Sequence, residues 1–317
     1  MSDKTRKVVI LGAGHVGSHV GMSLICHEVA DKIIYIDTNE EKAYSQALDL
    51  NDCTGSAGRR IEVRTGDYSD CADADIIVCA IGSEPVPGKK RLQMFDETIQ
   101  MAKTVVGPIK ESGFNGILIS ISNPADIIAD FIRKRTGLAK NHVFSTGTAL
   151  DSNRLRRVLW EKTGVDRNSI QAFCMGEHGD SSMAPFSRVY LGGRSLFELM
   201  SENPDTLGKL DLDEIIDEVH TSGFRIVKGK HSTEFGIGLV CCEIIKAILC
   251  DQKKIMAVSA FLDGEYGQSG VHAGVPCVLG KDGIEKIIEI PMLPNEKEAF
   301  GRSCGVIRSY IEKADKM

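Results

Sequence analysis

The chain has 317 residues, of which 42% are apolar and 26% charged, so it can bury a substantial core as one large domain or two of ordinary size. Its 38 basic and 44 acidic side chains give a net charge of −6 without a long run of one sign, which argues against a nucleic-acid-binding or membrane-surface protein. The ten cysteines form no CxxC pair and the polar start MSDKTRKVVILG lacks a secretory signal pattern. We therefore expect reduced thiols in a cytoplasmic protein.

The first half of the sequence alternates short β-branched runs with segments of helical composition, such as residues 15–28 and 93–112. Nearly continuous apolar strands alternating with helices are typical of a parallel sheet covered on both faces. Right-handed crossovers then make it a doubly wound α/β sheet. The predicted strands cover residues 7–12, 32–37, 61–66, 75–82, 116–122 and 142–147.

The pattern changes after about residue 148, where strands and helices no longer alternate regularly. Helices are expected over 149–163, 211–229, 233–250 and from about 295, with strands over 169–174, 186–191, 255–261, 275–279 and 287–292. The apolar segment GIGLVCCEIIKAILC contains Glu243 and Lys246 and is too short to span a bilayer, so we interpret it as a buried helix. We predict an α+β second domain over 148–317, and a large shared interface with the first domain, 1–147, because no flexible linker separates them.

The first predicted strand runs into a glycine-rich turn, VVILGAGHVGSHV, which places Gly12, Gly14 and Gly17 as G-x-G-x-x-G at the start of a helix. In a Rossmann domain the first glycine makes the tight turn, the second lets the backbone approach a pyrophosphate, and the third lets the helix pack closely on the sheet. Asp37 ends the second predicted strand, where a carboxylate can accept hydrogen bonds from the ribose hydroxyls and repel a 2′-phosphate. The sequence therefore predicts NAD as the cofactor in preference to NADP.

Three further stretches carry polar groups suited to catalysis: ISNPAD (121–126), GTALDSNRLR (147–156) and MGEHGDS (175–181). With the glycine-rich turn and PGKKR (87–91), they resemble the L-lactate/malate dehydrogenase family over nearly the whole chain. The motifs PGxxR, SNPxD, LDSxR and GEHGD occur in the family's order. The stretches KESGFNGILISISNP and STGTALDSNRLR look most like those of L-2-hydroxyisocaproate dehydrogenases.

The resemblance implies a role for each polar group in reducing a 2-oxo acid. His178 would be the general acid/base, which suits an imidazole near neutral pH. Asp151 would hold the imidazole in one tautomer, and Arg154, on the same helix, would grip the substrate carboxylate with two hydrogen bonds. Asn123 would hydrogen-bond the reacting oxygen and help place the nicotinamide. Arg91 would polarise the carbonyl as charge develops on its oxygen.

Other positions are implied by the same resemblance. Thr233 would lie beside the substrate side chain, although a helix N-cap is the plainer interpretation, and Ile237 would pack on the nicotinamide. No metal is implied, because GEHGD lacks the second histidine of a HExxH site. The remaining cofactor contacts would come from His15, Val16, Ala80, Ile81, Gly82 and Asn123.

The loop GSEPVPGKKR (82–91) would then be a lid that closes on the substrate and carries Arg91. Pro85 aligns with the position that distinguishes substrates in the family, where glutamine accompanies lactate and arginine accompanies malate dehydrogenases. Neither Pro85 nor Val86 can pair with a second carboxylate, so malate is disfavoured. Pyruvate is the first expectation and larger apolar 2-oxo acids the second. A non-catalytic NAD-binding protein is the competing class, but it explains only the glycine-rich turn and the acid after it.

The resemblance also implies a homo-oligomer, a tetramer in preference to a dimer, acting in glycolysis and fermentation. Arg156 matches an arginine that binds fructose 1,6-bisphosphate in many bacterial members, but Gln171 stands where the partner histidine is expected. We therefore predict weak or absent activation by this sugar bisphosphate. His231 stands where many members have glycine.

Overall fold

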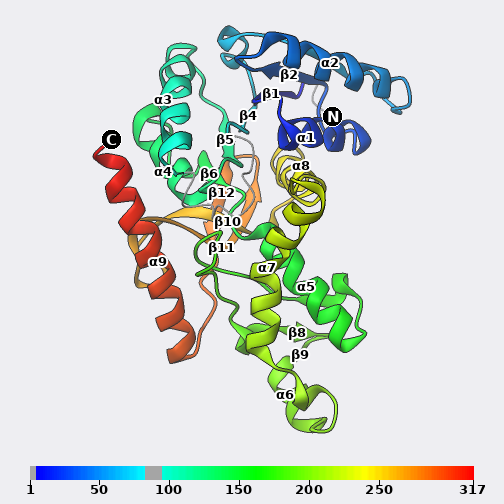
Figure 1. The fold of residues 1–317 in the computed structure, drawn as a ribbon, viewed down its shortest axis with the longest axis vertical. Coiled ribbons are helices and arrows are strands. Elements are labelled where there is room, and N and C mark those ends of the chain that lie inside the picture. The colour runs from blue at the N-terminus through cyan, green and yellow to red at the C-terminus, as the bar shows by residue number, and fades with distance from the viewer. Residues whose placement is uncertain (1–4, 83–94) are drawn as a thin grey trace.

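The computed structural model describes residues 5–82 and 95–317 (Figure 1). A sheet of nine strands runs through it in the order β12-β11-β10-β6-β5-β4-β1-β2-β3. The last six of these are parallel, in the 3-2-1-4-5-6 order of a Rossmann domain, so the predicted α/β fold class is confirmed. They are β1 (Lys7–Leu11), β2 (Lys32–Ile36), β3 (Glu62–Thr65), β4 (Ile76–Cys79), β5 (Ile117–Ser120) and β6 (Val143–Ser145).

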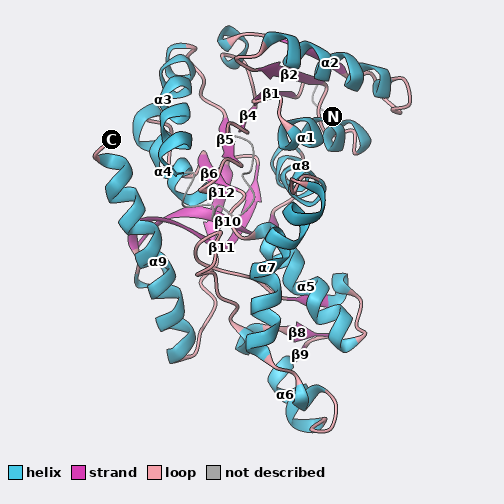
Figure 2. Cartoon of the chain, in the orientation of Figure 1, coloured by secondary structure: helices cyan, strands magenta, loops and turns pink. Residues whose placement is uncertain are grey.

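Helices cover both faces of this sheet (Figures 1 and 2). α3, α4 and α9 pack together along one side, while α1 and α8 pack against each other on the opposite side. The strands between them are therefore buried on both faces, which explains runs such as KVVIL in β1, where every residue is buried. The helices are α1 (His15–Cys26), α2 (Glu40–Thr54), α3 (Phe95–Glu111), α4 (Ala125–Thr136), α5 (Ala149–Thr163), α6 (Leu196–Glu202), α7 (Leu212–Lys230), α8 (Phe235–Leu249) and α9 (Pro294–Asp315).

The second half of the chain extends the same sheet with antiparallel strands. Ser259 of β10 pairs with Ser145 of β6, so the sheet continues across the predicted boundary at residue 147. A small separate sheet, beside α5 and α6, is formed by β7, β8 and β9 (Figure 2). The strands are β10 (Lys254–Asp263), β11 (Ser269–Gly280), β12 (Gly283–Ile287), β7 (Ile170–Gln171), β8 (Tyr190–Leu191) and β9 (Arg194–Ser195).

Three predicted strands are largely wrong. Of the predicted strand 169–174, Ser169 ends a 3₁₀ turn and only β7 (Ile170–Gln171) pairs. All of the run IIEIPM (287–292) except Ile287 lies beyond β12, because the Tyr266 hydroxyl donates to the carbonyl of Ile288 and accepts the N–H of Ile290. Of these described residues, only the N–H of Ile288 still bonds to β11. Of the predicted strand 186–191, Phe186–Arg188 forms a 3₁₀ turn and only β8 pairs. Among the described residues, no helix has both the length and the apolar character needed to cross a membrane.

Candidate active site

The glycine-rich turn after β1 has room only for glycine at two of its positions. Gly12 has φ +103°, and a Cβ there would lie 2.6 Å from the carbonyl oxygen of Ala80. A Cβ on Gly17 would collide with the carbonyl oxygen of Gly12. Any larger residue at either position would force the start of α1 away from the sheet, so these two glycines hold the first turn of α1 against β1 and the end of β4.

The groups around this turn fit a dinucleotide. Nothing lies within 4 Å of a Cβ built on Gly14, so a phosphate can approach the backbone where α1 begins with His15 and Val16. The carboxylate of Asp37, after β2, accepts the N–H of Ala13 at 2.7 Å and that of Asn39 at 2.9 Å. It is thereby fixed beside the turn, with lone pairs left for ribose hydroxyls. Residues 80–82 follow β4 on the adjoining strand.

Asp151 joins His178 and Arg154 into one chain of charged groups. Its Oδ2 lies 2.5 Å from Nδ1 of His178, and its Oδ1 accepts a hydrogen bond of 2.9 Å from Nη1 of Arg154. All three side chains are less than a tenth exposed. Charge-assisted hydrogen bonds in such a site are stronger than in water, so both the ring and the guanidinium are held in one orientation.

The loop that carries His178 is tied to the rest of the protein on several sides. Met175 and Met183 exchange two backbone hydrogen bonds, which close the loop at its base. Gly176 pairs in the same way with Gly274 of β11. Ser303 of α9 accepts the N–H of Glu177 at 2.8 Å. The imidazole is therefore presented from a fixed frame, as a catalytic group requires.

Asn123 lies between β5 and α4, and its Oδ1 is buried without a hydrogen-bond partner among the described residues. Thr233 and Ile237 lie at the start of α8, next to the glycine-rich turn, because His15 Nδ1 lies 3.6 Å from Oε2 of Glu234. The interpretation of Thr233 as an N-cap is wrong, since α8 begins at Phe235 and Glu234 occupies the cap position. Pro85 and Arg91 lie outside the described residues.

Comparison with known proteins identifies the family. Residues 6–145 match the lactate/malate dehydrogenase NAD binding domain, and residues 148–317 match the alpha/beta C-terminal domain of the same family. The chain belongs to the lactate/malate dehydrogenase family. It is 39% identical over 312 residues to L-lactate dehydrogenase 3 of Bacillus cereus (strain ATCC 10987 / NRS 248), covering 98% of this chain and 99% of the relative. It is 38% identical to the L-lactate dehydrogenase of Fusobacterium nucleatum, covering 98% and 97%.

Solved structures of the family superpose closely on this chain. The minor L-lactate dehydrogenase of Enterococcus mundtii, in its ligands-bound form, gives a TM-score of 0.91 at 33% identity and covers 98% of both chains. A malate dehydrogenase of Cryptosporidium parvum gives 0.92 at 26% identity, covering 99% of this chain and 100% of its own. The dehydrogenase is therefore an NAD-dependent oxidoreductase. Because lactate and malate enzymes share the backbone, the fold does not identify the substrate.

Asp126, the last residue of ISNPAD, has no role that the sequence alone predicts. In the dehydrogenase its Oδ2 accepts the backbone N–H of His178 at 2.9 Å, and its side chain is 1% exposed. The available signal was an acidic residue in the first turn of a helix that follows a polar strand end, but the same pattern is typical of ordinary helix starts. An ordinary helix-start carboxylate and one that binds the main chain of His178 differ only in tertiary contacts, here between α4 and a loop 52 residues away.

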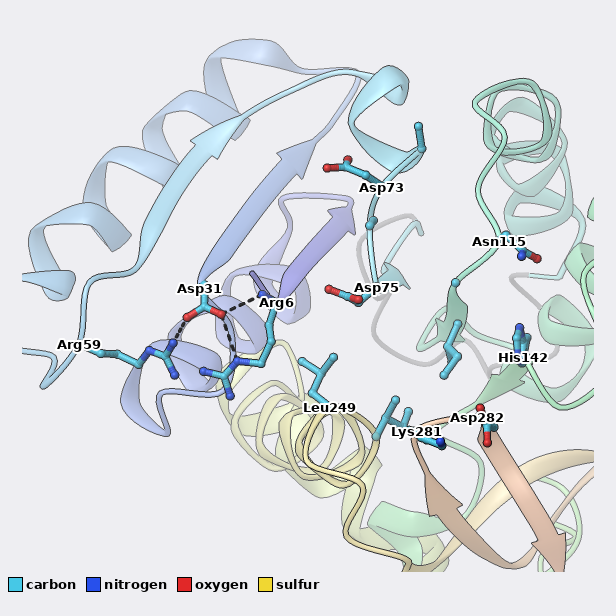
Figure 3. A pocket seen from close by; sticks show the side chains of 15 residues that line it. Arg6, Asp31, Arg59, Asp73, Asp75, Asn115, His142, Leu249, Lys281 and Asp282 are labelled. Atoms are coloured by element: carbon cyan, nitrogen blue, oxygen red, sulfur yellow. Dashed lines mark hydrogen bonds and ion pairs between the residues drawn. The ribbon is translucent and has the colours of Figure 1, made fainter. Parts of the chain in front are cut away.

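A pocket lies at the amino ends of the parallel strands (Figure 3). It has a volume of about 830 Å³, and its rim includes Arg6, Asp31 and Arg59. Both arginines pair with Asp31, so these charges are already used in ion pairs within the protein. Within residues 5–82 and 95–317 no three His, Cys, Asp or Glu side chains are grouped as metal ligands. The polar side chains predicted for catalysis lie toward the carboxyl ends of the strands, since Asn123 follows β5 and Asp151 follows β6. Open α/β sheets bind ligands at these ends.

Proposed function

We propose that this dehydrogenase reduces pyruvate to L-lactate with NADH and oxidises L-lactate in the reverse direction. The observation that carries the proposal is the chain Arg154–Asp151–His178, which aligns a carboxylate-binding cation with a proton donor in one buried site. A protein that only bound NAD would not need this arrangement. The names of its relatives, L-lactate dehydrogenases, support the same substrate.

His178 is proposed as the proton donor. Because Nδ1 faces the Asp151 carboxylate, we assign one proton to Nδ1 and the proton transfer to Nε2. Bound NADH supplies the hydride, for which the glycine-rich turn and Asp37 provide the binding surface. The proton on Nε2 goes to the carbonyl oxygen, and Asp151 stabilises the imidazolium before that transfer.

The substrate is oriented by the remaining groups. Arg154 has donors beyond the one it gives to Asp151, and these would hold the substrate carboxylate in a planar, two-point contact. Asn123 would donate to the reacting oxygen from the end of β5. Arg91, on the loop 82–91, would polarise the carbonyl, and Thr233 and Ile237 would border the substrate methyl group and the nicotinamide.

Pro85 makes pyruvate a better candidate than oxaloacetate, because the loop then offers no arginine for a second carboxylate at that position. A panel of kcat/KM values at fixed NADH tests this with pyruvate, oxaloacetate, 2-oxoisocaproate and phenylpyruvate, followed by NADH absorbance. Pyruvate is expected to be the best substrate. If 2-oxoisocaproate has the highest kcat/KM, the enzyme is an L-2-hydroxyisocaproate-type dehydrogenase. If oxaloacetate has the highest kcat/KM, the Pro85 argument is wrong. No turnover with any of the four would indicate a non-catalytic NAD-binding protein.

We further propose a homo-oligomer, with a tetramer preferred to a dimer. Large apolar side chains are exposed on α1, α2, α7 and α8, helices that follow one another down one side of the molecule (Figure 1). Such a surface is typical of a protein–protein interface. Light scattering after size-exclusion chromatography measures the mass, and a monomer would contradict the proposal. These residues are Met22, Tyr44, Leu48, Phe224, Ile226, Phe235 and Leu239.

Two other expectations remain proposals. The ten cysteines are all unpaired, which suits a reducing cytoplasm and a role in glycolysis and fermentation. Residues 1–147 and 148–317 are proposed as the cofactor and substrate domains. The pairing of β6 with β10 would make their interface a fixed one.

A further inference from the structure

We propose that Asp126 is a positioning residue for His178. The Asp126 carboxyl acts in two separable ways: it fixes the main chain of His178, and it places a second negative charge near the Asp151–His178 pair. The proposal rests on the proposed role of His178 as the proton donor. It adds a group that touches neither substrate nor cofactor in the proposed site. Its effect on the reaction passes through His178.

The first action follows from a single hydrogen bond. Asp126 Oδ2 accepts the N–H of His178 at 2.9 Å, across the gap between α4 and the His178 loop. Asp126 is the second residue of α4 and lies three positions after Asn123. One short segment therefore carries Asn123, proposed to bind the reacting oxygen, and the group that sets the position of the proton donor. Movement of that segment would move both together.

The second action follows from what surrounds the carboxyl. Asp126 faces Asp151 of α5, Glu177 of the His178 loop, Ser259 of β10 and Cys304 of α9. Asp126 Oδ1 is buried, and neither it nor Ser259 Oγ has a partner in hydrogen-bond geometry among the described residues. A carboxyl with one unsatisfied buried oxygen is costly to ionise.

The charge of Asp126 therefore changes within the working range of an enzyme. Burial raises the pKa of the Asp126 carboxyl to about 7, helped by the negative charges of Glu177 and Asp151 and opposed by the Ser259 hydroxyl and the N–H of His178. When the carboxyl is ionised, its charge stabilises the imidazolium form of His178; when it is protonated, that stabilisation is lost. Pyruvate reduction consumes the imidazolium proton, so the charge on Asp126 shifts the pH at which reduction fails.

Two substitutions separate the actions. Asp126→Asn keeps an acceptor for the N–H of His178 and removes the charge, whereas Asp126→Ala removes both. We expect Asp126→Ala to lower kcat for pyruvate reduction about tenfold, and Asp126→Asn to restore most of it. In both variants the alkaline limb of kcat/KM should move to lower pH by about one unit. The Kd for NADH, measured by fluorescence quenching, should not change.

The matched control is Asp130→Asn, which changes the next buried aspartate on α4. Asp130 pairs with His272 and Lys134, and no bond joins it to His178 in the described part of the chain. Asp130→Asn should lower Tm and leave the pH profile of kcat/KM in place. If Asp126→Asn gives the wild-type profile, or if Asp126→Ala keeps the wild-type kcat, the proposal is wrong. Should Asp126→Ala not fold, the profile of Asp126→Asn decides.

A readout without turnover distinguishes this proposal from the proposed function. Amide hydrogen exchange of the segment containing His178 should be faster in Asp126→Ala and close to wild type in Asp126→Asn. Unchanged exchange in Asp126→Ala would reject the main-chain role. If the unaltered protein reduces no 2-oxo acid, the proposed function and the charge effect both fall, and the exchange result still reports whether Asp126 positions His178.

Discussion

Asp151 Oδ2 lies 2.5 Å from Nδ1 of His178 although the two residues are 27 positions apart in the chain. The contact forms where α5 begins, because Asp151 lies in the first turn of that helix and the His178 loop folds back over it. An imidazole held in this way has one defined tautomer and a stabilised cationic form. The activity of the site should therefore depend on both the charge and the acceptor geometry at position 151.

Asp151→Asn should lower kcat/KM for pyruvate reduction about a hundredfold, because the amide can present its NH₂ to Nδ1 and favour the wrong tautomer. The Kd for NADH should stay near the wild-type value, since Asp151 bonds to His178 and Arg154. Steady-state kinetics and fluorescence titration measure the two quantities. An activity loss matched by an equal loss of NADH binding would point to general unfolding instead.

Arg154→Lys should reduce kcat/KM for pyruvate about a hundredfold, since an ammonium cannot reproduce two parallel hydrogen bonds to a carboxylate. Arg157→Lys on the same helix is the control: Arg157 pairs with Glu161 and Glu218 on a partly exposed face, and its replacement should leave kcat/KM unchanged. Wild-type kinetics in Arg154→Lys would contradict the two-point grip. NADH should bind both variants normally.

The two buried aspartates of α4 should have opposite effects on stability as the pH changes. The folded-state pKa of Asp126 is raised to about 7, so between about pH 4 and pH 7 the folded protein holds a proton that the unfolded chain releases. Stability from this group is present at low pH and is lost as the pH rises. As the pH rises across this range, the free energy of unfolding of Asp126→Asn should therefore increase relative to that of the wild type, by on the order of a few kcal/mol. Urea unfolding at several pH values measures the difference; a constant difference would be inconsistent with a raised pKa.

The contribution of Asp130 to stability should change with pH in the opposite direction. Burial alone would raise its pKa, but His272 and Lys134 lower it below the ordinary value of 3.8. Its contribution is complete above that value and is lost as the pH falls below it. Asp130→Asn should thus be less stable than the wild type at neutral pH, with the gap narrowing in acid.

His231 ends α7 in the left-handed conformation, with φ +69°. Glycine adopts this conformation without the Cβ clash, so it would suit this position better than histidine. His231→Gly should raise the free energy of unfolding by about 0.5–1 kcal/mol, after the greater chain entropy of glycine is subtracted. His27→Gly is the control, because His27 caps α1 with φ −99° and should gain nothing. Equal effects in both variants would remove the conformational explanation.

Fructose 1,6-bisphosphate should activate the enzyme weakly or not at all. Arg156 donates to the carbonyl of Ala172 at 3.1 Å and pairs with Asn153, so its guanidinium is engaged within the subunit. Gln171 is exposed on β7 and cannot carry the charge of the expected histidine. The KM for pyruvate should be the same with and without the sugar bisphosphate; a large decrease on its addition would refute the prediction.

The sequence by itself determined the layers of this protein and the place of its cofactor turn. Continuous apolar strands cannot face water on either side, and Gly12 and Gly17 each meet a carbonyl oxygen where a Cβ would stand, so these signals are local. The chain positions of Asp151, Arg154 and His178 were predicted by resemblance, but their contacts depend on where α5 and the His178 loop meet.

Only the tertiary structure decided what happens where distant segments compete for the same hydrogen bonds. The run 287–292 has the composition of a strand, yet Tyr266 takes the carbonyl of Ile288 and the N–H of Ile290 that a strand partner would need. Asp126 looks like an ordinary helix-start carboxylate until His178 is brought against it, because a hydrogen bond across 52 residues leaves no periodic trace in sequence. Steric restrictions such as those on Gly12 and Gly17 depend on residue type and can be inferred from the sequence. The hydrogen-bond partner of a buried carboxyl depends on which main-chain segment the whole fold places beside it.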